Sequence, residues 1–253
     1  MADGDDHRIL VPVDVLGGQS VPSTIIEAFA SVPVVLLGYH QVPDQTPSGL
    51  ARSKHEQRAR AELEELETVF EAAGCRVTTQ LVFTRDRFTT FERVAIERSC
   101  DAVLLTNPAP LLDRILVAIR GDVAVDHIAR LVSAVLADTT IDVTLFHVAS
   151  TEEGRERGRA PIEYAAKTLE AHGVERDRID TDIVVDRSPT DAIVDAAADH
   201  DLIVAGESRP SLQRYIFRDR VERIAKRTRD PILVIRAEYL EDDPFETNDA
   251  RSS

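Results

Sequence analysis

Arg8-Ile-Leu-Val-Pro-Val-Asp14 returns 106 residues later as Arg114-Ile-Leu-Val-Ala-Ile-Arg120. Each segment is a short apolar run that ends in a charged residue, which is typical of a strand buried in a parallel sheet. A second pair behaves in the same way, because Asp101-Ala-Val-Leu-Leu-Thr106 returns 100 residues later as Asp201-Leu-Ile-Val-Ala-Gly206. Two pairs with nearly the same offset predict that the chain contains one domain twice.

Helical patterns separate the predicted strands in both copies. The clearest runs from Ser48 to Gly74, where apolar residues repeat at helical spacing between Leu63 and Phe70. In the second copy, the segment 162–172 shows a helical pattern that ends at Gly173. Strands that alternate with helices predict parallel sheets joined by right-handed crossovers. We therefore expect an α/β fold made of two tandem doubly wound parallel-sheet domains.

The two copies are unequal at their carboxyl ends. The second copy continues after Gly206 with a helical segment, 221–227, and a further apolar strand, 231–236. The first copy offers only residues 108–113 before the repeat begins, which is too short for a helix and a parallel strand. We therefore expect the first copy to lack its last helix and strand. The predicted boundaries are 1–110 and 111–240 for the domains and 241–253 for an acidic, disordered tail.

The net charge of the chain restricts the classes of molecule that it can bind. The chain has 253 residues with 30 basic and 45 acidic side chains, a net charge of −15, so nucleic-acid binding and direct membrane insertion are not expected. Only three basic residues are lysines, Lys54, Lys167 and Lys226. Such a surface indicates adaptation to high salt, although an ordinary acidic protein would share part of this pattern. The polar N-terminus and two isolated cysteines predict a cytoplasmic location.

The chain resembles the universal stress protein family over roughly residues 7–237. Ile9-Leu-Val-Pro-Val-Asp14 is similar to that family's first strand and residues 201–206 to its fourth. Residues 221–226 and 231–236 are similar to its last helix and last strand. The resemblance implies a five-stranded parallel sheet in each domain, pairing of domains through the last strand and, in some members, an ATP site.

The phosphate-binding motif of that family is incomplete in both copies. ATP-binding members have a Gly-x-x-Gly loop after the fourth strand and a Gly-Ser or Gly-Thr pair before the last helix, where the backbone can approach phosphates. The second copy has Gly206 but carries Arg209 at the second glycine and Arg218-Asp219 at the Gly-Ser pair. In the first copy, Thr106-Asn107-Pro108 replaces the phosphate loop.

The family's aspartate at the end of the first strand, which helps to hold the adenosine, is Asp14 in the first copy and Arg120 in the second. We expect ATP or another anionic nucleotide to bind weakly or not at all. The resemblance implies these candidate ligand-binding residues: Asp14, Arg120, Val148, Gly206, Ser208, Arg209, Arg218 and Asp219.

Each candidate has a structural alternative. Asp14 either contacts a ligand or caps the turn that follows it. Arg120 either draws an anion into the second copy's pocket or closes that pocket by pairing with a nearby carboxylate. The arginines at 209, 214, 218 and 220 either hold phosphate in place of glycine N–H groups or form surface ion pairs.

The histidines predict neither a metal site nor a catalytic site. His40 and His147 end the second predicted strand of each copy, where a packing role is expected. No metal-ligand spacing with acids or cysteines is evident for the other histidines: His7, His55, His127, His172 and His200.

The sequence thus predicts a non-catalytic regulatory or ligand-sensing protein with weakened or lost ATP binding. The alternatives are a nucleotide-binding or nucleotide-hydrolysing protein and a pure assembly scaffold. Ile232-Leu-Val-Ile235 is an apolar strand expected at the sheet edge, where it would pair with a second copy of the chain in a homodimer. A regulatory protein partner is compatible with all three functions.

Overall fold

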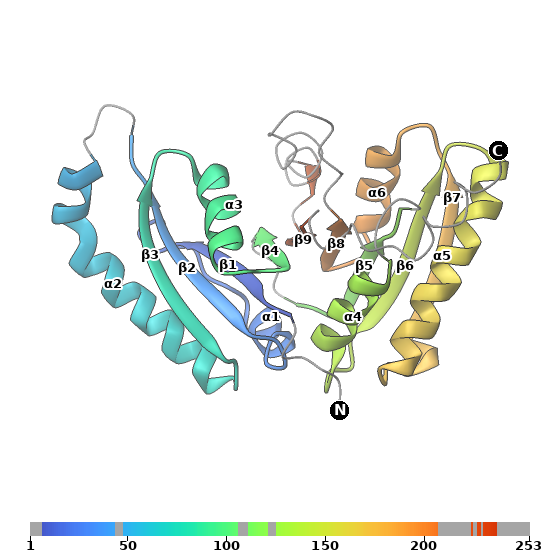
Figure 1. Ribbon diagram of the computed structural model, residues 1–253, viewed down its shortest axis with the longest axis horizontal. Helices are drawn as coiled ribbons and strands as arrows, with labels where there is room; N and C mark the ends of the chain where they lie inside the picture. Colours follow the sequence, from blue (N-terminus) through green and yellow to red (C-terminus); the bar gives the residue numbers. More distant parts are fainter. Residues whose placement is uncertain are drawn as a thin grey trace, which may run out of the picture.

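The computed structural model describes residues 7–43, 48–105, 111–120, 125–206, 224, 227–228 and 230–236, with only the backbone for residues 48–54. The chain forms one nine-stranded sheet flanked by helices (Figure 1). The elements are β1 (Ile9–Asp14), α1 (Ser23–Ala28), β2 (Val34–Gln41), α2 (Ser48–Ala72), β3 (Val77–Thr84), α3 (Arg87–Glu97), β4 (Ala102–Leu105), β5 (Arg114–Ala118), α4 (Val125–Leu136), β6 (Asp142–Ala149), α5 (Glu152–Ala171), η1 (Arg176–Arg178), β7 (Ile179–Val185), α6 (Pro189–Ala197), β8 (Leu202–Gly206) and β9 (Ile232–Ile235).

The strand order, β3-β2-β1-β4-β9-β8-β5-β6-β7, contains the duplication. Strands β1 to β4 form one half and β5 to β9 the other, and each half grows outward from its first strand to its third before adding its fourth on the opposite side. Neighbouring strands within each half are parallel. This confirms the predicted α/β class with two similar, doubly wound halves.

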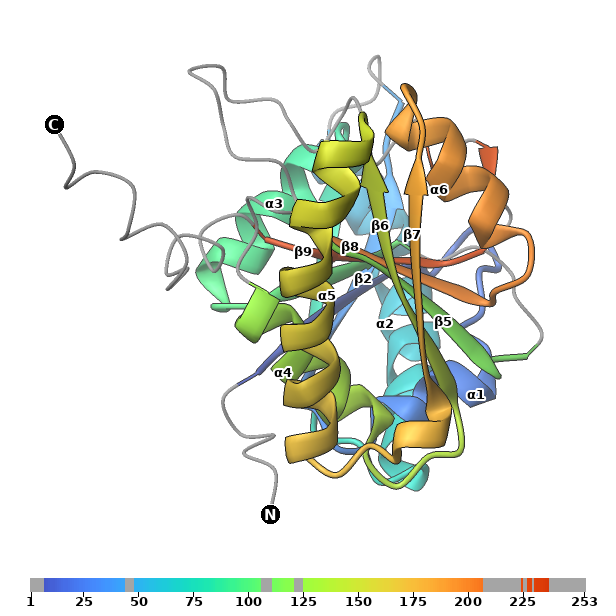
Figure 2. The ribbon, with the colours of Figure 1, turned by 90° about the vertical axis from the view of Figure 1, so that its right-hand side faces the viewer.

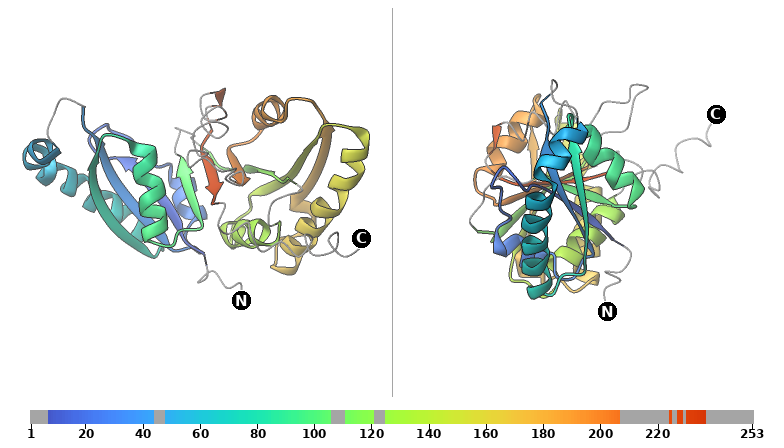
Figure 3. Two further views of the ribbon diagram at one scale, coloured as in Figure 1. Left: turned by 45° about the horizontal axis from the view of Figure 1, so that its top comes forward. Right: turned by 90° about the vertical axis from the view of Figure 1, so that its left-hand side faces the viewer.

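Strand β9 joins the two halves. It pairs in parallel with β8 of its own half and antiparallel with β4 of the other, where Val234 lies opposite Val103. Figure 3 shows β9 between β4 and β8. In the described part of the chain, β5 is the next element after β4, so the first half has four strands and β9 occupies the place beside its fourth.

The prediction that two chains pair through Ile232–Ile235 to form a homodimer is therefore wrong. Both hydrogen-bonding edges of β9 are already occupied by strands of the same chain. All four residues of the strand are completely buried. The sequence placed this strand at an edge because a fifth parallel strand ends a single domain, whereas here the shortened first half covers that edge.

Two helical layers cover the sheet, and each layer packs on a core that spans both halves. One face buries apolar side chains of α1, α2, α4 and α5, and the other face those of α3 and α6. Leu233 of β9 contributes to the first core and Val234 to the second. Figure 2 shows α5 running along β6 and β7. Because both cores continue across β9, the two halves share the hydrophobic core on each face of the sheet.

Two helices differ from the sequence-based expectation. Helix α4, Val125–Leu136, was not predicted, although nine of its twelve residues are buried. Helix α5 begins at Glu152, ten residues before the predicted start, and contains Pro161. Thr151 caps it by accepting a hydrogen bond from the Gly154 N–H at 3.1 Å. The structure therefore has one continuous helix where the sequence predicted only its second half.

The two cysteines, Cys75 and Cys100, are free thiols buried within the core. Burial raises the pKa of Cys75 to about 11 and that of Cys100 to about 12, so both remain thiols at neutral pH. No helix among the described residues combines the length and the apolar character that crossing a membrane requires. The predicted tail, 241–253, lies outside the described residues.

Candidate functional site

A cavity of about 500 Å³ opens at the carboxyl end of β6, against the first half of α5. Ligands of open α/β sheets bind beyond the carboxyl ends of the strands, most often where the strand order reverses. In this half the order reverses between β8 and β5, so the cavity lies at the carboxyl end of the sheet, one strand away from that point. The cavity is lined by Val125, His147, Val148, Ala149, Ser150, Gly154, Arg157, Gly158, Ala160 and Pro161.

The floor of the cavity is fixed by His147 and Gly158. The His147 ring is buried, and its Nδ1 lies 2.9 Å from the backbone oxygen of Ile119, the residue after β5. The ring passes so close to α5 that a Cβ atom at Gly158 would lie 2.3 Å from His147 Cδ2. A side chain at position 158 would therefore displace the ring, and glycine is required there for steric reasons.

The polar groups of the cavity favour an anion over a cation. Arg157 is exposed and is the charged residue of the lining, and none of the described lining residues is acidic. Arg120 follows Ile119 directly, so its backbone leaves the sheet beside His147. Apolar walls with one guanidinium at the rim suit a flat, partly apolar anion such as a nucleotide.

Four of the eight predicted site residues are described by the structure: Asp14, Arg120, Val148 and Gly206. Val148 lines the cavity, and Gly206 ends β8 opposite Ile235 of β9. The other four, Ser208, Arg209, Arg218 and Asp219, lie outside the described residues.

Asp14 acts as a cap of the loop that follows β1. Its Oδ1 accepts hydrogen bonds from the N–H groups of Leu16, at 3.3 Å, and Gly17, at 3.0 Å. The same oxygen lies 3.7 Å from Nδ1 of His40. Asp14 belongs to the other half of the sheet from the cavity, so the structure does not unite it with Val148 and Gly206.

The strand register shows that His40 and His147 do not occupy equivalent places. Pro12 pairs with Leu37, and its counterpart Ala118 pairs with Phe146. His147 is one residue beyond Phe146, whereas His40 is three residues beyond Leu37. The equivalent of His147 is therefore Gly38, and the predicted match between the histidines is wrong by two residues.

Sequence reasoning missed Arg157 and Gly158 because it began α5 after Pro161. Thr151 followed by Glu152 and Glu153 is a helix-start signal that could have extended the helix upstream. With the helix extended, both residues fall on its first half, beside the end of β6.

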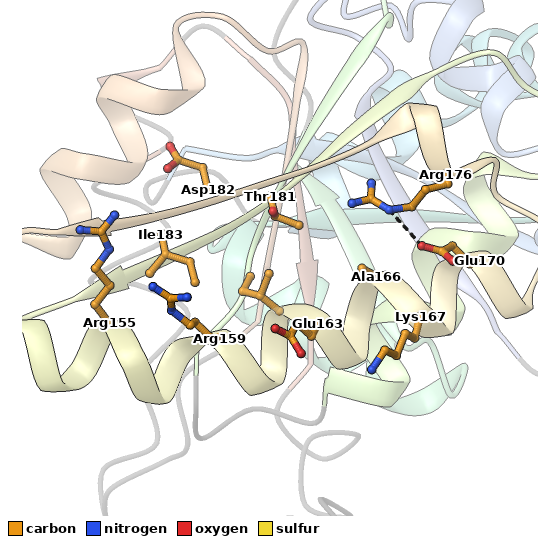
Figure 4. A pocket seen from close by; sticks show the side chains of 11 residues that line it. Arg155, Arg159, Glu163, Ala166, Lys167, Glu170, Arg176, Thr181, Asp182 and Ile183 are labelled. Carbon is orange, nitrogen blue, oxygen red and sulfur yellow. Dashed lines mark ion pairs between the residues drawn. The ribbon is translucent and has the colours of Figure 1, made fainter.

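A second hollow, of about 470 Å³, lies between α5 and the edge strand β7. Figure 4 shows Arg155 and Arg159 projecting from α5 on one side of it and Asp182 on the strand. Its cations are accompanied by carboxylates, and Arg176 Nε lies 3.2 Å from Glu170 Oε1. The mixed charges make it a weaker candidate for an anion than the cavity at β6.

The chain matches no known protein-family model and no curated protein sequence. Its fold, however, is similar to solved structures. A universal stress protein from Archaeoglobus fulgidus aligns with a TM-score of 0.61 and 16% identity, covering 90% of this chain and 96% of that one. The cytoplasmic domain of a prokaryotic cation chloride cotransporter aligns with a TM-score of 0.54 and 13% identity, covering 90% and 94%. A putative universal stress protein from Pseudomonas aeruginosa gives 0.49 and 18%, covering 91% and 93%.

The sheet and the carboxyl-end cavity define a doubly wound α/β protein with a candidate ligand site. More particularly, the chain has the fold of a tandem universal stress protein. The cotransporter domain shares that fold, so the fold by itself does not determine the function, which has to be argued from the site.

Proposed function

We propose that the chain is a universal stress-type regulatory protein, non-catalytic and cytoplasmic, which senses an anionic ligand through the cavity at the end of β6. The observation that carries this proposal is the composition of the cavity wall. It is apolar apart from His147, Ser150 and Arg157, and no described lining residue is acidic, in a chain with a net charge of −15. A cavity without carboxylates is the place where such a protein can accept an anion.

A non-catalytic role is favoured by how the imidazole of His147 is held. Its Nδ1 contacts a backbone carbonyl, that of Ile119, instead of a carboxylate that would support a general base. The hydroxyl in the lining, that of Ser150, belongs to an exposed residue at the rim. Ligand binding that changes affinity for a regulatory partner requires neither group to react.

Weak binding of Mg-ATP is part of the proposal. In the sequence, Arg209 and Arg218-Asp219 stand where ATP-binding universal stress proteins have glycine and Gly-Ser, so this chain lacks the glycines that let the backbone approach phosphates closely. Asp219 adds a negative charge there. We expect a dissociation constant for Mg-ATP well above the low micromolar range.

A scaffold function remains the second candidate, and strand β9 is the observation that favours it. The two halves are fused through β9 into one sheet, a rigid platform that needs no ligand. The scaffold hypothesis predicts that the cavity binds nothing, so ligand titration separates the two functions.

The test is isothermal titration of the full chain with AMP, cyclic AMP, Mg-ATP and inorganic phosphate. Arg157→Ala should weaken binding of the nucleotide that binds best by about tenfold, the effect of losing one charge-assisted hydrogen bond. Arg159→Ala is the matched control, because Arg159 lies on the same helix, is also exposed and lines the other hollow.

Ala160→Phe tests the site independently by adding bulk to the cavity wall from an exposed position on α5, and it should abolish binding while the thermal melt is retained. Binding that is lost equally in Arg157→Ala and Arg159→Ala would contradict the proposed site. No binding of any of the four ligands would favour the scaffold.

A further inference from the structure

His7, Asp101 and His127 meet where the start of the first half contacts helix α4 of the second. Nδ1 of His7 lies 3.5 Å from Oδ1 of Asp101, and Nε2 of His127 lies 3.4 Å from the same oxygen. The three atoms lie within 4.8 Å of one another. We propose that these residues, the His–Asp–His cluster, form a binding site for a divalent transition-metal cation of the Zn²⁺ class.

The two distances to Asp101 agree with tetrahedral coordination. Zinc binds imidazole nitrogen and carboxylate oxygen at about 2.0–2.2 Å, so two ligand atoms at a tetrahedral angle are separated by about 3.3–3.5 Å. The separations of 3.5 and 3.4 Å match that edge. The two imidazole rings meet at 73°, with centroids 5.2 Å apart, so they approach the carboxylate from different directions.

The burial of His7 and Asp101 indicates that Nδ1 of His7 needs a partner. The side chains of His7 and Asp101 are 8% and 4% exposed. Nδ1 of His7 is buried and has no hydrogen-bond partner among the described residues, which is costly for an imidazole nitrogen. A cation bound to Nδ1 and Oδ1 would remove that cost.

Asp101 is held rigidly in a position that leaves Oδ1 for a cation. Its Oδ2 accepts a hydrogen bond from the Arg8 N–H at 2.6 Å. Its backbone N–H donates to the oxygen of Arg8 at 2.8 Å, and its carbonyl accepts from the N–H of Arg236, just after β9, at 2.8 Å. Such support orients a ligand before the metal arrives. The His127 side chain is 20% exposed, which provides an open side for a water molecule as the fourth ligand.

The second copy contains the same aspartate without the histidines. Asp201 is the repeat of Asp101, and its Oδ2 accepts hydrogen bonds from the N–H groups of Asp113 and Arg114, both at 2.9 Å. Asp113 stands at the place of His7, 106 residues further on. The aspartate therefore has a capping role in both copies, and only the first copy adds the nitrogen ligands that a metal site needs.

The experiment uses the full chain after removal of metal by EDTA and dialysis. Calorimetric titration with Zn²⁺ should give one ion per chain, and Co²⁺ should give the visible absorption bands of a tetrahedral site. His7→Gln and His127→Gln should each lower Zn²⁺ affinity at least tenfold and remove the Co²⁺ bands. His172→Gln is the matched control, since His172 is bound through Nδ1 to the Thr168 oxygen, outside the cluster.

His127 is more exposed than His7, so His127→Gln is the variant that is expected to fold normally, which circular dichroism and thermal melting would verify. Unchanged Zn²⁺ affinity in folded His127→Gln, or equal losses in His127→Gln and His172→Gln, would overturn the proposal. So would the absence of Zn²⁺ binding by the full chain, which would leave the cluster as an ion pair.

Discussion

The two copies place a glycine on opposite sides of the same helix–strand contact. In the first copy the glycine is on the strand: a Cβ at Gly38 would lie 3.1 Å from the Leu63 side chain of α2, which fills this space. In the second copy the strand carries His147 and the helix carries Gly158. In the first arrangement the Leu63 side chain fills the space beside the strand, whereas the second arrangement borders the cavity at the end of β6.

The neighbouring strand position extends this difference. Register aligns Tyr39 with Val148. Tyr39 is buried and packs edge-to-face on Phe91 of α3, with ring centroids 5.0 Å apart. Val148 is smaller and packs against the same core, the one that α3 and α6 cover. The two copies therefore differ in side-chain volume on both faces of the second strand, while both keep the same backbone.

The largest effect is expected where the two copies are joined. Leu233→Ala in β9 should lower the free energy of unfolding by about 2–5 kcal/mol, because the side chain is completely buried in the core that spans both halves. Leu111→Ala is the control, since Leu111 is 56% exposed, and it should cost less than about 0.5 kcal/mol. Urea unfolding measures both. Equal effects would show that β9 is not the structural joint of the molecule.

Gly158→Ala tests the contact that borders the cavity, and it should cost about 1–3 kcal/mol because the new methyl group overlaps the His147 ring. Gly154→Ala, one helical turn earlier, meets its nearest atom at 3.3 Å and should change stability by less than about 1 kcal/mol. Adding His147→Ala to Gly158→Ala should recover part of the loss in a double-mutant cycle. Additive losses would mean that the two residues do not compete for the same space.

Added salt should stabilise both copies together. With a net charge of −15, self-repulsion is screened as KCl rises from 0.1 to 2 M, and we expect a gain of about 1 kcal/mol, or roughly 2–4 °C in Tm. Because the two cores are continuous across β9, thermal melting should remain one transition. A flat or falling Tm would contradict salt adaptation, and two transitions would contradict the shared core.

The smallest expected change in stability concerns the surroundings of the equivalent aspartates, Asp101 and Asp201. Asp101 has histidine neighbours, whereas the neighbour of Asp201 is another acid, Asp230. Burial raises the pKa of Asp230, and the negative charge of Asp201 raises it further. A carboxyl pKa that is higher in the folded than in the unfolded state makes stability fall as pH rises between those values. Asp230→Asn should therefore stabilise the chain slightly at pH 7, within about 0.5 kcal/mol because the group is partly solvated, and not at pH 3. Thermal melts at the two pH values check this, and an equal gain at both would exclude the electrostatic cause.

The sequence by itself determined the α/β class, the duplication and the inequality of the copies. Buried parallel strands are nearly continuous apolar runs, so Ile9–Asp14 and Leu202–Gly206 could be recognised from local composition. The shortened end of the first copy could likewise be inferred, because chain length limits what 108–113 can form.

Tertiary structure decided where β9 goes and which side chains meet. The residues of a strand indicate that it is buried, but they do not specify which strand it pairs with. The antiparallel pairing of Ile232–Ile235 with β4 could therefore not be predicted from the sequence. Arg157 and Gly158 reach the cavity only because α5 continues through Pro161, which packing permits. His7, Asp101 and His127 are brought together by the sheet and by a helix from the other half, so no local spacing could reveal them.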